Sequence, residues 1–247
     1  MNAFLQSGES TSSSGSPENG SGTALRSVAE RRRSSRDEVI AILAEDPEPD
    51  DEYEERYGGS NMDPTTLSLN TVRGQALGAV MDYMLWIRRD HDLSGDQEAL
   101  DSGFDAMPEV RDLLERHLDP DVDPSAAVRS VYGRMIPWLV LVDEQWVRDQ
   151  LPLLFPEEEP LTHLRDAAWD AYVVFSRVYD QTFDVLEDQY SRAIERLGSE
   201  TREGALHDDP DHQLGEHLMI QYWRGRLDLS EDGLIRRFFE RADDDAR

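Results

Sequence analysis

The sequence contains no cysteine and no lysine. All 25 of its basic residues are arginine, and 53 aspartate and glutamate residues outnumber them, which gives a formal net charge of -28 over 247 residues. Without cysteine the chain has no disulfide framework, no thiolate metal site and no cysteine nucleophile. The acid excess argues against general nucleic-acid binding, because contacts with phosphates need a basic surface.

Long apolar runs are also missing. The longest one, residues 136–142, is far shorter than the roughly 20 residues of a membrane-spanning helix. The N-terminus shows no basic region followed by an apolar one, so no signal peptide is expected. These two absences predict a cytoplasmic protein that does not enter a membrane.

The acid excess continues inside the segments that have helical patterning, so it belongs to the folded surface as well as to any tail. A highly charged surface resists precipitation, and molar salt shortens the Debye length to about 3 Å and screens the self-repulsion. We therefore expect a halophilic, archaeal source. An ordinary acidic protein with a disordered tail is the alternative interpretation.

The N-terminal quarter of the chain is polar and poorly patterned. Residues 7–23 are mostly Ser, Gly, Glu, Pro and Asn, a composition that predicts a disordered tail. Residues 25–44 could form a short helix, whose central RRRSSR stretch is the only basic cluster and the only candidate for nucleic-acid contact. Residues 45–55 are acidic and contain two prolines, which indicates a linker. The predicted organisation is a tail over 1–62 and a folded domain over 63–247.

Apolar residues begin to recur at a helical period from Asn70 onwards. Steps of three or four place one set on a single helix face about 30 Å long: Val72, Ala76, Val80, Tyr83 and Ile87. Similar stripes follow after residue 108, between residues 161 and 197, and from residues 214 and 234. In another segment, Asp123 and Pro124 predict a helix start, with a capping carboxylate and a proline at the first helical position.

Pro137 interrupts the stripe that starts after Asp123. Proline removes a helical hydrogen bond, so a kink or break is expected before Trp138. Residues 138–142 could be a strand, but Leu139, Val142, Trp146 and Gln150 keep helical spacing and no second strand-like segment offers a partner. Helix is therefore favoured here.

Six or seven amphipathic helices with no convincing strand predict an all-α fold. Two architectures remain open: helical hairpins stacked in an α-solenoid-like array, or an irregular bundle around one core. The five tryptophans fall on the predicted helix stripes and are expected in the core.

The string around Asn70, Arg73 and Gly74 is the candidate structural motif. Asn70 and Arg73 are polar residues at the start of an apolar helix, where they can satisfy loop carbonyls or helix ends. Gly74 and Gly78 lie inside that helix at a cost of about 1 kcal/mol each, which indicates close helix approach more than ligand contact.

Two clusters contain the ingredients of metal sites. Asp119, Asp121 and Asp123 have the spacing that opens an EF-hand loop, but Pro124 and Ser130 occupy positions that need Gly and Glu. The second cluster combines carboxylates with histidines spaced five or more residues apart: His207, Asp208, Asp209, Asp211, His212 and His217. It is the basis of an alternative function, that of a metal-dependent enzyme or regulator. Solvated acidic segments explain both clusters better. With no phosphate-binding loop and no nucleophile elbow, we assign no catalytic, cofactor or metal residue.

The Asn70-x-Val72-Arg73-Gly74-x-Ala76 string, with AVRSVYGRMIPWLVLVDEQWV and LFP after it, resembles the helical-repeat regions of large prokaryotic STAND-type NTPases of antiviral defence. The resemblance covers roughly residues 63–241. In that family an effector and a NACHT-like ATPase precede a helical sensor that recognises viral proteins. The resemblance implies a detached, sensor-like region, and the chain as a whole is expected to be a non-enzymatic helical interaction or scaffold module with a protein partner.

Overall fold

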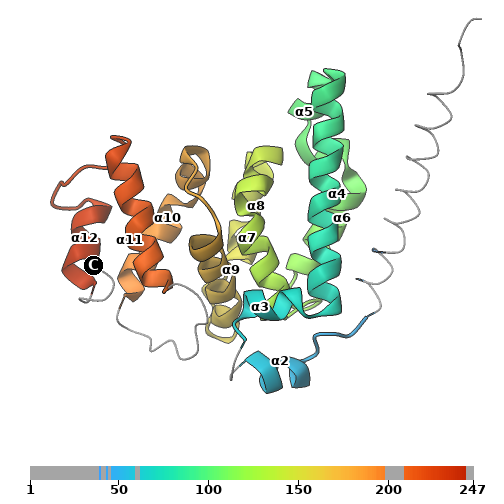
Figure 1. Cartoon of the computed structure of the whole chain (residues 1–247), viewed down its shortest axis with the longest axis horizontal. Helices are drawn as coiled ribbons and strands as arrows, with labels where there is room; N and C mark the ends of the chain where they lie inside the picture. The colour runs from blue at the N-terminus through green and yellow to red at the C-terminus, as the bar shows by residue number, and fades with distance from the viewer. Residues whose placement is uncertain (1–38, 40–42, 44–45, 59–61, 198–208, 243–247) are drawn as a thin grey trace, which may run out of the picture. The chain divides into compact units, whose positions relative to one another are not determined.

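The computed structural model of the chain describes residues 39, 43, 46–58, 62–197 and 209–242 (Figure 1). Over these residues the protein has eleven α-helices, two short 3-10 helices and no strand. The all-α prediction is confirmed. The expected tail over residues 7–23 and the RRRSSR cluster lie outside the described residues.

The helices and 3-10 helices have the following bounds. In chain order they are α2 (Asp51–Gly58), α3 (Pro64–Leu69), α4 (Val72–Ser94), α5 (Gln97–Asp101), the 3-10 helix η1 (Gly103–Ala106), α6 (Pro108–Leu118), α7 (Ala126–Val142), α8 (Glu144–Leu154), the 3-10 helix η2 (Glu159–Leu161), α9 (Thr162–Phe175), α10 (Asp180–Arg196), α11 (Pro210–Trp223) and α12 (Leu234–Arg241).

Helix α7 lies at the centre of the packing and contacts α3, α4, α8, α9 and α10 (Figure 1). Its sequence is apolar on nearly every side, as a helix surrounded by others requires. The contact with α9 is the closest: a Cβ added at Gly133 would lie 2.0 Å from the backbone oxygen of Ala168. Only glycine permits this approach of the two backbones.

One continuous hydrophobic core runs from Leu43 to Ala242 and includes side chains of α4 and of α6 to α12. In a solenoid each helix pair contacts only its neighbours in sequence. Here α7 contacts α3 and α4 before it and α8, α9 and α10 after it, so the irregular bundle describes this core better. Helices α11 and α12 add to it by packing on α9 and α10.

Helix α7 continues through Pro137 to Val142, so the chain does not break before Trp138, and of the two alternatives the kink stays a prediction. Pro137 is buried, and the surrounding helices hold α7 in place despite the lost hydrogen bond. The chain changes direction six residues later instead. Asp143 caps α8, accepting a hydrogen bond of 2.9 Å from the Trp146 amide. Helix was the right choice over strand, but the stripe it was based on spans two helices.

The buried side of α4 is rotated from the predicted face. Ala76 and Val80 are buried as expected, but Tyr83 and Ile87 are only partly buried. The most deeply buried side chains of this helix are those of Leu77, Met81 and Met84. The predicted stripe followed β-branched and aromatic residues and omitted the Leu and Met side chains that fill the core.

The segment expected to be a linker packs on the helical domain. Within it, Pro49 is buried and α2 carries Glu54 to the N-terminus of α7. With Leu43 in the core, the packed region therefore includes residues N-terminal to the start expected at residue 63. No helix among the described residues has the length and hydropathy of a membrane span.

Candidate interaction surface and buried polar network

The turn between α3 and α4 brings the candidate structural motif together. A Cβ at Gly74 would lie 2.2 Å from the Ser68 backbone oxygen, so glycine is needed where the two helices meet. Asn70 follows α3, and its side-chain amide donates a hydrogen bond of 2.8 Å to the Thr66 carbonyl. Gly78 was expected at a similar close approach, but a Cβ added there would meet no described atom within 4 Å.

Arg73 ties the N-terminal segment to the bundle. Its backbone amide donates 2.9 Å to the Glu48 carbonyl, and its guanidinium donates to the Pro49 carbonyl. The same guanidinium lies 3.3 Å from the Asp123 carboxylate. All of these contacts are with the protein's own groups, as the structural interpretation of Asn70, Arg73 and Gly74 expects; their assignment to structure rather than to a ligand stays a prediction.

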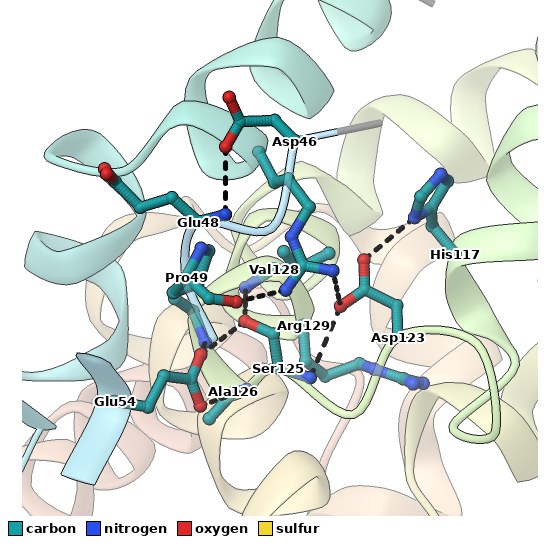
Figure 2. A network of polar contacts seen from close by, with 12 residues as sticks. Asp46, Glu48, Pro49, Glu54, His117, Asp123, Ser125, Ala126, Val128 and Arg129 are labelled. Atoms are coloured by element: carbon teal, nitrogen blue, oxygen red, sulfur yellow. Dashed lines mark hydrogen bonds and ion pairs between the residues drawn. The ribbon is translucent and has the colours of Figure 1, made fainter. Parts of the chain in front are cut away.

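Asp123 is the centre of the network, and its side chain is fully buried. One of its oxygens lies 2.8 Å from His117 Nδ1, and the other lies near Arg73 and accepts a 3.4 Å hydrogen bond from the Ser125 amide (Figure 2). Asp123 was expected to cap the following helix. The helix instead begins at Ala126 and Ser125 is its N-cap, because the buried carboxylate is engaged by Arg73 and His117.

This arrangement does not form an EF-hand loop. Asp119 and Asp121 are not buried, and Asp119 accepts a hydrogen bond from the Asp121 amide, whereas the Asp123 oxygens point to His117 and Arg73. Among the described residues no three His, Cys, Asp or Glu side chains gather in a group that could hold a metal ion.

Glu54 reaches the N-terminus of α7 from α2. Its carboxylate accepts hydrogen bonds from the Ser125 hydroxyl and from the amides of Ala126 and Ala127, at 3.1 and 3.2 Å for the two amides (Figure 2). The first amides of a helix have no partner within the helix, and a negative charge there complements the helix dipole. A residue from the supposed linker thus caps the central helix.

Arg129, one turn further along α7, is buried and joins the C-terminal ends of two helices. Its guanidinium donates 2.8 Å to the carbonyl of Leu118 at the end of α6, and also to the carbonyl of Leu153 in the last turn of α8. Burial lowers the pKa of the Arg129 guanidinium, an effect opposed by nearby Tyr132 and Asp123. The last carbonyls of a helix favour a cation, so Arg129 satisfies two helix ends at once.

Helical spacing alone does not reveal His117, Arg129 and Glu54 as members of one network. One signal was present: His117 lies among Leu113, Leu114 and Leu118 on the buried stripe of α6, where an imidazole needs a polar partner. Its partner, six residues away on a loop, could not be identified from the helical period.

The histidine and aspartate cluster separates in the structure. His207 and Asp208 lie outside the described residues. Asp209 caps α11, accepting a hydrogen bond from the Asp211 amide, and His212 is exposed, 3.5 Å from Glu216. His217 is buried on the other side of α11. Of the four described members of this cluster, His212 and His217 therefore lie on opposite sides of α11 and do not converge on one site.

His217 belongs to a buried chain of hydroxyl and imidazole groups. Its Nδ1 lies 2.8 Å from the Tyr190 hydroxyl, which lies 2.9 Å from the Tyr172 hydroxyl. Burial lowers the pKa of His217 to about 4, although a backbone hydrogen bond with Ser176 opposes this shift. At neutral pH the imidazole is uncharged and links α9, α10 and α11 within the core.

The opposite side of α11 exposes large apolar side chains. Trp223 is 91% exposed, Met219 44% and Tyr222 38%. With Ile220 these residues form the α11 face, and together with Glu216 they line an open groove of about 430 Å³. For Trp223, and for Tyr222 on the same predicted stripe, the expected place in the core is wrong, because the core side of α11 is formed by Leu214, Leu218 and Gln221. Trp138 on α7, which was also expected in the core, is 42% exposed.

Comparison of the chain with protein-family models, with curated proteins and with solved structures gives no match. The resemblance to sensor regions of defence NTPases therefore stays a prediction.

Proposed function

We propose that the protein is a non-enzymatic α-helical interaction module that binds a protein partner through the α11 face. The observation that carries this proposal is the near-complete exposure of Trp223 beside Met219 and Tyr222. Aromatic residues and methionine are enriched where proteins contact one another, and tryptophan is among the residues that contribute most to binding.

The spacing of these side chains supports a functional surface. Met219 and Trp223 lie four residues apart on one stripe of α11, with Ile220 and Tyr222 beside them. Single exposed apolar residues need no explanation, whereas a contiguous set around a groove marks a contact site. The buried network around Asp123 supports the same division of roles, since its charged groups are engaged in holding the fold.

We further propose a setting for this module in a halophilic cytoplasm, as a sensor-like part of a defence system. The support is the net charge of -28 and the resemblance carried by Asn70, Arg73 and Gly74. The neighbouring genes provide the test: an adjacent ATPase or nuclease frame would support a split sensor, and an isolated gene would remove that part of the proposal.

The interaction itself is tested by co-purification from the native source in molar salt. Trp223→Ala should remove the partner protein, because loss of a central binding tryptophan typically costs about 2 kcal/mol or more, or roughly 30-fold in Kd. Leu93→Ala is the matched control, since Leu93 is 76% exposed at the far end of α4.

Both variants should keep the helicity and the melting temperature of the original protein, because both side chains are exposed. A partner that Leu93→Ala retains and Trp223→Ala loses supports the α11 face. A partner that survives Trp223→Ala unchanged would overturn the proposal.

A further inference from the structure

The α11 face has the geometry that suits another helix. Glu216, Met219 or Ile220, and Trp223 are separated by steps of three or four, so they follow one stripe over about two helical turns, or roughly 10 Å. A ridge of this kind packs into the groove between side chains of a second helix, and amphipathic helices bind such surfaces through anchors at the same spacing.

The charge next to the α11 face is negative. Glu216 lines the groove, and its contact there is with exposed His212. The loop that follows α11 also carries exposed acids, Asp228, Asp232 and Glu231, the last of which lies 3.8 Å from the Arg236 guanidinium. A partner that covers this face would therefore gain from cations placed beside its apolar anchors.

The arginines that follow Trp223 are already paired with α10. Arg224 donates 2.7 Å to Asp180 and 3.0 Å to the Val178 carbonyl, and Arg226 pairs with Asp184. The Arg224 guanidinium lowers the pKa of Asp180, as expected for a direct ion pair. These two arginines neutralise α10 carboxylates and leave the carboxylate of Glu216 as the charge within the groove.

From this geometry and charge we propose that the partner of the α11 face is a cationic amphipathic helix. The inference rests on the proposed function and adds the chemistry of the partner. Leu-type or aromatic side chains of that helix would pack on Met219, Tyr222 and Trp223, and an Arg or Lys at its edge would pair with Glu216.

A second copy of this chain fits the surface less well. Each copy carries a net charge of -28, and the arginines that follow its own α11 face are paired with Asp180 and Asp184. Two such surfaces would bring the same charge together, which opposes association unless salt screens it. Self-association is therefore the competing outcome of the test.

The test uses the full chain and a labelled synthetic peptide of about 18 residues, built from Leu and Arg at amphipathic helical spacing. Two control peptides accompany it: one of the same composition in scrambled order, and one with Glu in place of Arg. Binding is measured by fluorescence anisotropy in about 0.15 M and about 2 M KCl, because salt screens the charge contribution and leaves the apolar one.

The Leu and Arg peptide should bind, and Trp223→Ala should weaken it at least tenfold at both salt concentrations. Glu216→Arg should weaken it about five- to tenfold at low salt and less at high salt. The matched control Asp90→Arg, an exposed acid on α4, should change Kd less than twofold.

Three results would overturn the proposed partner chemistry: no binding of the Leu and Arg peptide, equal binding of either control peptide, or equal effects of Glu216→Arg and Asp90→Arg. A dimer seen by sedimentation and lost in Trp223→Ala would assign the face to a second copy. If Trp223→Ala still removes the native partner in the co-purification test, any of these results leaves the proposed function intact. Retention of that partner would overturn the proposed function itself.

Discussion

The N-terminus of α7 and the outer face of α11 distribute polar and apolar groups in opposite ways. Around α7, the charged side chains of Asp123 and Arg129 are buried and that of Arg73 is only 13% exposed. On α11, Met219, Tyr222 and Trp223 lie outside it. Both arrangements reverse the usual rule of apolar inside and polar outside, so each calls for a physical reason.

The reason differs between the two regions. At α7 each buried charge meets a group of opposite charge or an unpaired helix end. The network therefore offsets the free-energy cost of helix-end amides and carbonyls, and of buried charges, that would otherwise have no partner. At α11 the apolar side chains meet nothing within the described protein that covers them. A buried charge paired with groups of its own chain indicates structure, and an apolar surface that is not covered indicates contact with a partner.

Removing the central carboxylate of the buried network is among the largest expected effects. Asp123→Ala should lower the free energy of unfolding by about 3 to 5 kcal/mol, because Arg73 and His117 would lose their shared buried carboxylate. Urea denaturation at fixed molar KCl measures this. The control Asp121→Ala removes an exposed acid from the same loop and should change stability by less than about 0.5 kcal/mol.

Arg73→Ala extends this test to the candidate structural motif. It should lower stability in the same direction and leave binding at the α11 face unchanged. Unchanged melting together with lost partner binding would instead assign Arg73 to a binding site and remove the contrast between the two regions.

The second expected effect is a loss of folding stability at acidic pH that is caused by His217. The pKa of His217 is about 4 in the folded protein against an ordinary 6.5, so below pH 6.5 the unfolded chain binds a proton that the folded one does not. Its contribution to stability is therefore complete above pH 6.5 and is lost as the pH falls towards 4. Tyr190 and Tyr172, which complete the chain of hydrogen bonds, stay neutral over this range.

The size follows from the linkage between proton binding and folding, at most about 1.4 kcal/mol per pH unit for one group. Between pH 7 and pH 4 the original protein should lose roughly 2 to 3 kcal/mol more than His217→Gln. The comparison with the variant is essential because the surface carboxylates also titrate in this range. Parallel curves for the two proteins would show that His217 is not buried in its neutral form.

Helical spacing predicts much of the fold, but little of the network at the N-terminus of α7 or of the α11 face. It identifies the all-α class and the buried stripe of α10, because an amphipathic period reports directly on which side is covered. The stripe predicted for α9 is right for Leu164, Ala168 and Tyr172 and wrong for Phe175 and Tyr179, which are exposed. It places the start of the central helix two residues early and misses Glu54, because capping of α7 depends on a residue 72 positions away from Ala126. A contact between residues this far apart in the sequence produces no periodic pattern.

The α11 face is missed for a different reason. Leu214, Leu218, Tyr222 and Trp223 all satisfy helical spacing to some degree, so the sequence alone places them together in the core. Only the packing shows that Leu214 and Leu218 face the core while Tyr222 and Trp223 face outward. A helix that is apolar on two sides either lies in the centre of a bundle, as α7 does, or carries a contact surface.

The smallest expected effect is that of Trp223→Ala on stability, and setting it against the effect of Trp169→Ala gives the sharpest test of the comparison. Trp169 is 2% exposed and packs on Phe155 and Tyr190, so Trp169→Ala should cost about 3 to 5 kcal/mol of stability. Trp223 is exposed, and Trp223→Ala should change stability by less than about 0.5 kcal/mol. Thermal and urea denaturation of the two variants at equal salt measure both values. A loss above about 1 kcal/mol in Trp223→Ala would mean that the side chain packs within the folded chain, and the α11 face would then be part of the core rather than a surface kept for a partner.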